Sequence, residues 1–185
     1  MIIVCNSCFR DPGFSPIPEI TYKSIAFIKR ETTPSSIEVK LGFKDGDGDL
    51  GLSTTDRLPP FNNETITITG NIEVQNNPNY YNINVIYLVK KTDNTFKPCE
   101  EEPDSCSLAN QKQLELLQGR FGDLNPDRKA RPISGVLTFE FKFFLRNSVR
   151  DTSYLRGKTI KLKLFIKDRK LNQSNTVETD TLRIK

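Results

Sequence analysis

A short acidic turn carries the sharpest chemical signal in the sequence. Asp45, Asp47 and Asp49 alternate with Gly46 and Gly48, and no basic residue stands between them. Carboxylates this close together repel one another unless a cation neutralises them. Ca²⁺ takes about six to eight oxygen ligands, which a tight glycine-rich turn can point inward. The turn therefore predicts a Ca²⁺ site with these three aspartates as ligands. The alternative is a polar turn without an ion, because Asp-Gly pairs also form ordinary hairpins.

The spacing of the acidic residues partly follows an EF-hand loop. Counted in that way, Asp45, Asp47 and Asp49 take the first three acidic positions and Asp56 takes the twelfth. Leu50, however, stands where that loop requires glycine, and the flanking patterns are those of strands. We therefore expect an acidic turn between two strands, with Asp56 as a further metal ligand.

A second segment, residues 165–175, joins the last two predicted strands. In an immunoglobulin-like sandwich, this loop opens at the same pole as the loop that holds the acidic turn. Asp168 and Asn172 are therefore candidate metal ligands, and Asn175 is an alternative oxygen donor. The competing interpretation is an ordinary loop in which Asp168 pairs with a neighbouring lysine or arginine.

Four cysteines indicate export. An apolar run ends at Cys5, with Cys8 shortly after it and a proline-containing tether beyond. This arrangement resembles the end of a bacterial lipoprotein signal, so Cys5 and Cys8 are both candidates for lipidation. Cys99 and Cys106 bracket an acidic loop and predict a local disulfide. The rival is a zinc site made of all four thiolates, for which only the first pair has the usual spacing.

The composition argues against catalysis and against nucleic-acid binding. The chain has no histidine, which removes the commonest general base and every Ser-His or Cys-His pair. An enzyme would need paired carboxylates, and nothing places two of them across a cleft. The candidates are Glu100, Glu101, Glu102 and Asp104, chosen only because they are acidic. The net charge of +4 is mild and spread along the chain, unlike a phosphate-binding surface. We expect no enzymatic activity.

Alternating apolar and polar residues predict about seven strands. They cover residues 19–28, 36–43, 65–74, 83–89, 135–145, 159–167 and 176–184. One long loop over residues 92–132 holds a short predicted helix at 111–117. This pattern predicts an all-β fold, an immunoglobulin-like β-sandwich. Residues 1–18 are expected to be the remnant of a lipoprotein leader with its tether, and residues 19–185 the sandwich domain.

Four separated segments together resemble an uncharacterised family of lipoproteins from the Bacteroidota. They are residues 18–20, 43–52 with 59–62, 119–121 with 124–127, and 166–169 with 171–172 and 174–175. The resemblance implies an immunoglobulin-like domain tethered to a membrane, in the periplasm or at the outer membrane. It implies no activity. The chain departs from the family in its truncated leader and in the loop between Cys99 and Cys106.

The expected function is a non-catalytic, Ca²⁺-stabilised module of the cell envelope that binds an envelope protein or a glycan, or has a structural role. A lipid anchor would hold it at the outer membrane. Surface-exported relatives in the family that the chain resembles often carry acidic residues soon after the lipidated cysteine. Here Arg10 and a single Asp11 follow, so the resemblance favours the periplasmic face over the cell surface. One alternative is an accessory subunit of an outer-membrane assembly that docks through residues 92–132. Another is a glycan-acting enzyme with paired carboxylates.

Overall fold

Alternating apolar residues build the first antiparallel sheet. The computed structural model describes residues 13–30, 35–69, 71–98, 101, 118–143 and 155–185. The sheet has the order β1 (Glu19–Ile28), β2 (Ser35–Asp45) and β7 (Ile133–Phe143). The cross-strand pairs with buried side chains are Ile37 with Phe141, Val39 with Phe139, and Leu41 with Leu137. Because side chains alternate between the faces of a strand, these pairs all lie on one face, which is the core face.

The second sheet presents its own apolar face to the first. Its order is β10 (Leu182–Arg183), β8 (Thr159–Ile166), β5 (Ile83–Lys90) and β6 (Phe96–Pro98), and β9 (Val177–Glu178) also pairs with β8. The residues of β8 that point into the core are Ile160, Leu162, Leu164 and Ile166. Lysines alternate with them, and Lys163 is exposed. This alternation is the one expected from the sequence.

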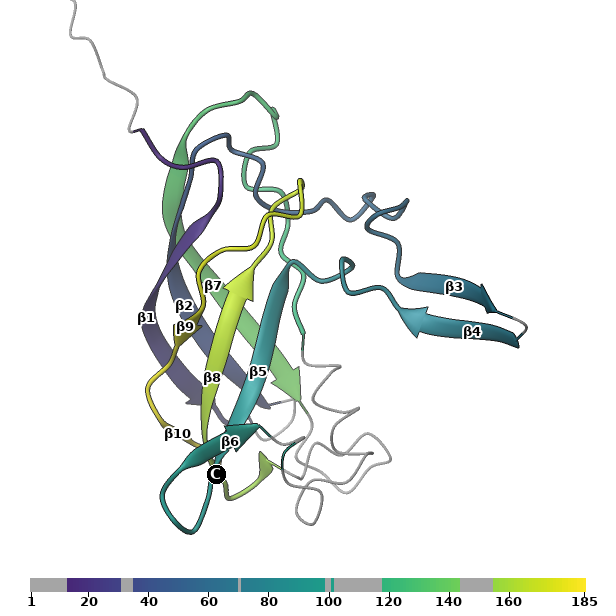
Figure 1. The fold of residues 1–185 in the computed structure, drawn as a ribbon. Coiled ribbons are helices and arrows are strands. Elements are labelled where there is room, and N and C mark those ends of the chain that lie inside the picture. Colours follow the sequence, from purple (N-terminus) through teal and green to yellow (C-terminus); the bar gives the residue numbers. More distant parts are fainter. Residues whose placement is uncertain (1–12, 31–34, 70, 99–100, 102–117, 144–154) are drawn as a thin grey trace, which may run out of the picture.

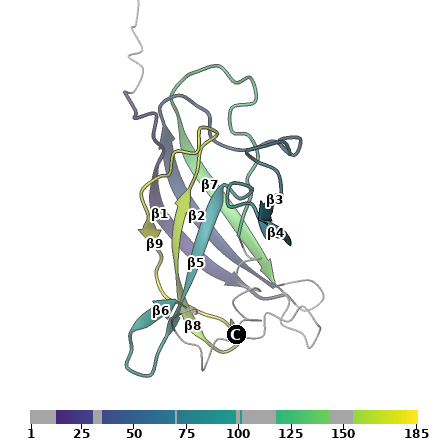
Figure 2. The same cartoon turned by 45° about the vertical axis from the view of Figure 1, so that its right-hand side comes forward.

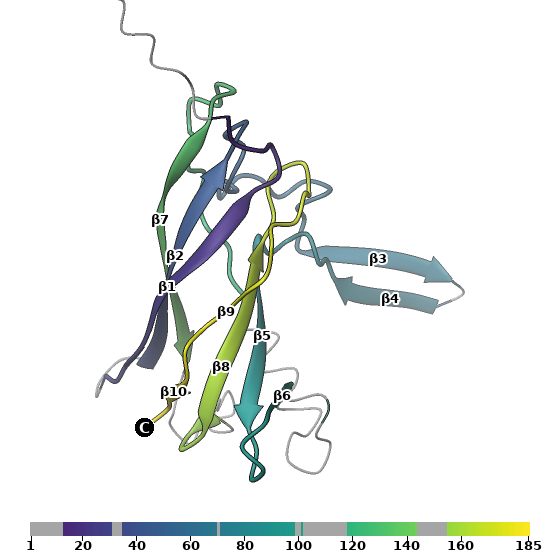
Figure 3. The same cartoon turned by 60° about the vertical axis from the view of Figure 1, so that its left-hand side comes forward.

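The two sheets pack face to face around one core (Figure 1, Figure 3). The Phe121 and Phe139 rings meet edge to face, with 5.6 Å between their centroids. Asn175 joins the sheets at one edge, because it donates to the carbonyl of Ile20 in β1 over 2.9 Å and accepts from the Ile20 N–H over 2.8 Å. The prediction of an all-β fold with two stacked antiparallel sheets is confirmed at this level.

A hairpin stands away from both sheets (Figure 1, Figure 2). It consists of β3 (Glu64–Thr69) and β4 (Asn71–Asn76), which pair with each other and with no other described strand. The prediction of a single strand over residues 65–74 was wrong. The alternation of polar and apolar residues continues through both strands, so it hid the reversal, although Gly-Asn at residues 70–71 is a turn signal.

The last predicted strand, residues 176–184, is two short strands in the structure. Residues 176–184 contain β9 and β10, because Thr179 breaks the ladder between them. Its hydroxyl accepts the N–H of Leu162 over 3.0 Å, while its own N–H donates to the Leu162 carbonyl over 2.9 Å. The predicted helix at 111–117 lies outside the described residues. Within the part of the chain that is described, no helix is long and apolar enough to cross a membrane.

Candidate metal centre

The acidic turn begins at the last residue of β2. Asp45 is completely buried (0% exposed), and its Oδ2 accepts the backbone N–H of Asp49 over 3.0 Å, which closes the turn. Gly48 has a φ of 72°, a backbone conformation that side chains disfavour. The Asn125 side-chain amide donates to the Gly48 carbonyl over 2.9 Å. The turn is therefore held in shape from within and from the loop that precedes β7.

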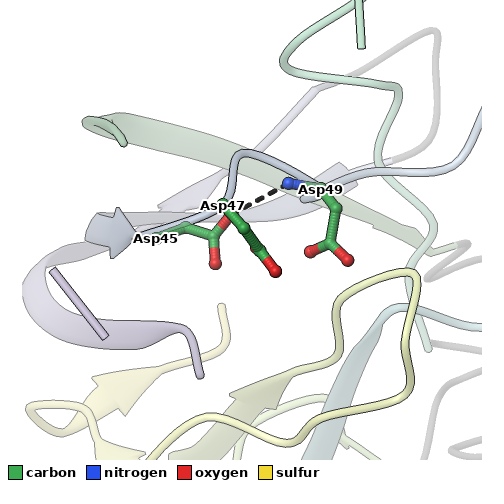
Figure 4. Close-up of side chains that lie close together, drawn as sticks. All are labelled: Asp45, Asp47 and Asp49. Atoms are coloured by element: carbon green, nitrogen blue, oxygen red, sulfur yellow. Dashed lines mark hydrogen bonds between the residues drawn. The ribbon is translucent and has the colours of Figure 1, made fainter. Parts of the chain in front are cut away.

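The three carboxylates of this turn converge (Figure 4). One oxygen each of Asp45, Asp47 and Asp49 lies within 4.8 Å of the others. Four oxygens are shielded from solvent and accept no hydrogen bond from any described residue: Asp45 Oδ1, Asp47 Oδ1, and both oxygens of Asp49. Buried charged oxygens without partners are costly, and a bound cation is the usual solution. This group could bind a metal ion.

Burial and mutual repulsion raise the pKa values of two of these carboxylates. Burial, the Asp47 carboxylate and the Asp168 carboxylate raise the pKa of Asp45 to about 6. Burial and then the charges of Asp168, Asp47 and Asp45 raise the pKa of Asp49 to about 7. Both shifts mean that the ionised forms are disfavoured without an added positive charge. A proton or a cation at the centre relieves the same repulsion.

Asp168 comes to this group from the other sheet. It follows β8, and the N–H of the next residue, Arg169, donates to the Asp49 carbonyl over 3.2 Å. The Asp168 side chain is 1% exposed, and Asn172 donates to both of its oxygens, from the backbone over 2.7 Å and from the side-chain amide over 2.8 Å. Burial raises the pKa of Asp168. Asp168 therefore lies beside the three-carboxylate group and adds charge to it.

Asp56 is held elsewhere, so its prediction as a metal ligand was wrong. Its two oxygens accept from the Arg169 guanidinium over 2.7 and 2.9 Å, and the Ser53 N–H donates to it over 2.6 Å. The bonds from Arg169 lower the pKa of Asp56. The EF-hand count places a twelfth residue at the ion only when the chain curls around it. Here Leu50, which is 0% exposed, turns into the core and carries the chain away.

The two asparagines form hydrogen bonds with neighbouring residues. Asn172 is the donor that orders Asp168 through its amide nitrogen, and its own role as a metal ligand stays a prediction. The Asn175 oxygen is engaged with the backbone of Ile20. The alternative in which Asp168 pairs with a neighbouring lysine or arginine is also wrong, because its partner is Asn172.

Lys170 is a site residue that the sequence analysis missed. Its ammonium group forms an ion pair with Asp47 Oδ2 and lies 3.8 Å from Asp49 Oδ2. The Lys170 side chain is 63% exposed, so the ammonium reaches the group from the solvent side. The available signal was the close spacing of Asp168 and Lys170 in one loop, which the predicted meeting of the two loops brings to the acidic turn.

Arg120 fixes the segment that follows the acidic turn. Its guanidinium donates to the carbonyls of Ser53 and Tyr80 over 3.1 Å each, and also to those of Asp56 and Phe61.

The sequence segments on which the family resemblance was based contribute to this one end of the molecule. Residues 18–20 are among them, because Ile20 pairs with Phe43 just before the acidic turn and bonds to Asn175. Several of their polar residues hold backbone in place here, as Arg120 and Asn125 do.

The remaining predicted sites fall outside the described residues. They are Cys5, Cys8, Cys99 and Cys106, together with Glu100, Glu102 and Asp104. Glu101 is described and exposed. The lipidation, disulfide and zinc interpretations therefore stay predictions.

Comparisons of the chain with protein-family models, with curated proteins and with solved structures found no match. The interpretation of the acidic group accordingly depends on the geometry and chemistry of its own residues.

Proposed function

We propose that the chain is a non-catalytic module of the cell envelope whose stacked sheets are stabilised by Ca²⁺. One observation carries the proposal: four buried carboxylate oxygens from Asp45, Asp47 and Asp49 converge without hydrogen-bond donors. An acidic group that served only as a turn would be expected to find donors or solvent for these oxygens.

The choice of Ca²⁺ follows from the donor set. All the oxygens are carboxylate oxygens, whereas zinc prefers nitrogen and sulfur ligands. Mg²⁺ requires nearly ideal octahedral geometry and usually keeps several waters with only one or two carboxylates. Ca²⁺ accepts irregular geometry and both one-oxygen and two-oxygen binding by a carboxylate. Both oxygens of Asp49 lack donors, which suits two-oxygen binding.

The ion would connect the two sheets. Asp45 ends β2 in one sheet, and Asp168 follows β8 in the other. Both are buried, and the Asp168 charge already acts on Asp45 and Asp49. We propose that Asp168 completes the negative shell, directly or through a water. A cation there would draw the two loops together and stiffen this end of the sandwich.

We further propose that the sandwich is immunoglobulin-like. In that fold, strands A, B and E are neighbours in one sheet, and strands C, F and G in the other. The order β1-β2-β7 corresponds to A-B-E. In the other sheet, β5 corresponds to C, β8 to F, and the two short strands β9 and β10 together to G. β6 extends the second sheet beyond β5 in the position of an extra edge strand, and the β3–β4 hairpin is an insertion between B and C. The acidic turn and Asp168 then belong to loops at one pole.

Thermal unfolding tests the calcium proposal directly. With Ca²⁺ at 100 times its dissociation constant, the folded state gains about 2.7 kcal/mol, which raises Tm by roughly 5–11 °C for a chain of this size. Asp49→Asn should lose most of this shift. Asp127→Asn is the matched control, because Asp127 lies near this end, is exposed and pairs with Arg131. Equal Tm values in Ca²⁺ and in EGTA would refute the proposal.

Membrane attachment is a separate proposal. We propose that the apolar run before Cys5 and Cys8 is part of a lipoprotein leader and that the module is anchored to the outer membrane, on the periplasmic face. Metabolic labelling with a palmitate analogue, with Cys5→Ser and Cys8→Ser compared, identifies the modified residue. Recovery of unlabelled protein in the aqueous phase for both variants and for the parent would argue against an anchor.

An accessory role in an outer-membrane assembly is the second candidate. The observation that favours it is the β3–β4 hairpin, which stands away from the sheets (Figure 3). Two-stranded hairpins on their own are marginally stable in water, so a packing partner is expected. Replacing residues 64–76 by a short turn should abolish co-purification of a specific membrane protein without lowering the Tm of the sandwich. Unchanged co-purification would remove this candidate.

A further inference from the structure

Lys170 contacts the candidate metal centre as a tethered cation. Its ammonium group pairs with Asp47 Oδ2 and lies 3.8 Å from Asp49 Oδ2, while most of its side chain stays in solvent. The contact involves only Asp47 Oδ2. The other oxygen, Asp47 Oδ1, is shielded from solvent and remains without a donor. Lys170 therefore covers the mouth of the group, while the buried oxygens behind it keep no hydrogen-bond donor.

Charge counting shows what Lys170 leaves uncompensated. With Asp45, Asp47, Asp49 and Asp168 ionised, the group carries four negative charges, and Lys170 supplies one positive charge. Arg169 stands near but is committed to Asp56 by two hydrogen bonds. Three negative charges thus remain. A monovalent ion that took the place of Lys170 would leave the same three, whereas a divalent ion would leave only two.

We propose that Lys170 is the specificity-determining residue of the metal centre: it acts as a built-in monovalent cation that competes with the bound ion, lowers the affinity for Ca²⁺ and excludes Na⁺ and K⁺. The inference rests on the proposed Ca²⁺ site. Because the ammonium is attached to the same loop as Asp168, its effective concentration at the mouth is far above that of a free ion. Only a cation of higher charge displaces it.

Calorimetric titration with CaCl₂ tests the proposal. Lys170→Met should bind Ca²⁺ about 3- to 10-fold more tightly than the parent chain, because an exposed ion pair no longer has to be broken and one repelling charge is gone. Lys170→Arg keeps the charge and should restore an affinity near that of the parent. Lys129→Met is the matched control for the loss of one exposed lysine at the same end, where Lys129 presents only its backbone carbonyl to Asn125.

A second readout separates competition from a merely structural role. Both proteins are compared in choline chloride and in NaCl, in EGTA and at constant ionic strength. The Tm of the parent chain should be the same in the two salts, and the Tm of Lys170→Met should be higher in NaCl. A structural ion pair would instead lower the Tm of the variant in both salts and leave its Ca²⁺ affinity unchanged.

The outcomes distinguish the two proposals. If the parent chain binds no Ca²⁺, the proposed function fails together with this inference. If the parent binds Ca²⁺ and Lys170→Met binds it with equal or lower affinity, the metal centre stands and the role of Lys170 is refuted. Because Lys170 is exposed, Lys170→Met is expected to fold. If it does not, the Ca²⁺ affinity of Lys170→Arg is compared with that of the parent chain instead.

Discussion

The backbone N–H of Asp49 donates to Oδ2 of Asp45 over 3.0 Å, so one carboxylate both closes the acidic turn and contributes to its centre. The other oxygen of Asp45, Oδ1, is buried and has no donor among the described residues. The hydrogen bond holds Asp45 and Asp49 in mutual contact although their charges repel. The turn is therefore built in a shape that is unfavourable for the ionised side chains unless a cation is present.

Substitution of Asp45 by asparagine should separate the two tasks of this residue. The asparagine oxygen can still accept from the Asp49 N–H, while one negative charge is lost. We expect Asp45→Asn to be more stable than the parent in EGTA at pH 7.5, and to lose at least about tenfold in Ca²⁺ affinity because one anionic ligand is missing. Urea unfolding with and without Ca²⁺ measures both effects. If the variant were less stable than the parent in EGTA, the negative charge of Asp45 would not destabilise the metal-free protein.

The pH dependence of stability between about pH 4 and pH 7 should be present in EGTA and lost in Ca²⁺. The pKa of Asp45 is raised to about 6 and that of Asp49 to about 7, from 3.8 in the unfolded chain. Between about pH 4 and pH 7 the folded, metal-free protein holds protons that the unfolded chain has released. The free energy of unfolding in EGTA should therefore fall as pH rises through this window.

In excess Ca²⁺ this fall should disappear, because the ion binds only the deprotonated carboxylates and the folded protein then holds no extra protons. The chain has no histidine, so no imidazole titrates in the same window. Asp49→Asn should flatten the curve in EGTA. Parallel curves in Ca²⁺ and EGTA would show that Ca²⁺ does not displace these protons.

The ion pair between Arg169 and Asp56 should be worth much more than an exposed one. Its side chains are only 19% and 16% exposed, and Arg169 uses two nitrogens. Arg169→Ala should lower the free energy of unfolding by about 2–3 kcal/mol, since Asp56 is left largely buried without its partner. Arg30→Ala is the control, because the pair of Arg30 with Glu140 has a similar length of 2.8 Å but is exposed. That change should cost less than about 1 kcal/mol. Equal losses would mean that the partial burial of Arg169 has no effect.

Gly51 should tolerate no side chain. Its φ is 100°, and a Cβ atom there would lie 2.1 Å from the Gly122 carbonyl oxygen. Gly51→Ala should therefore cost about 2 kcal/mol or more in chemical denaturation. Gly122→Ala lies on the other side of the same contact, where a Cβ meets nothing within 4 Å, and should change stability by less than about 0.5 kcal/mol. A small loss of stability in Gly51→Ala would show that Gly51 and Gly122 do not approach each other this closely.

Much of the fold was predictable because period-two alternation reports directly on a sheet with one buried face. The strands containing Leu41 and Leu164 were predicted on that basis, and both residues are 0% exposed. The hairpin was not, because alternation in residues 65–74 is equally compatible with one strand or two. Short β6 offered only three residues, too few for any periodicity.

The part of the candidate site that lies within one short turn was predictable from the sequence. The part that depends on the path of the chain after the turn was not. Asp45, Asp47 and Asp49 are close together because they share one turn. The position of Asp56 depends on where Leu50 turns the chain, and the sequence spacing alone says nothing about this. The roles of Arg169 and Lys170 depend on which side chains face the acidic turn after the loops meet, which requires coordinates.

A crystal grown with Ca²⁺ and measured at a wavelength where calcium scatters anomalously would show the ion itself. An anomalous peak is expected between the carboxylates of Asp45, Asp47 and Asp49, with Lys170 displaced from Asp47. Carboxylates spread apart into solvent, with no anomalous peak between them at millimolar Ca²⁺, would contradict the proposed Ca²⁺ site.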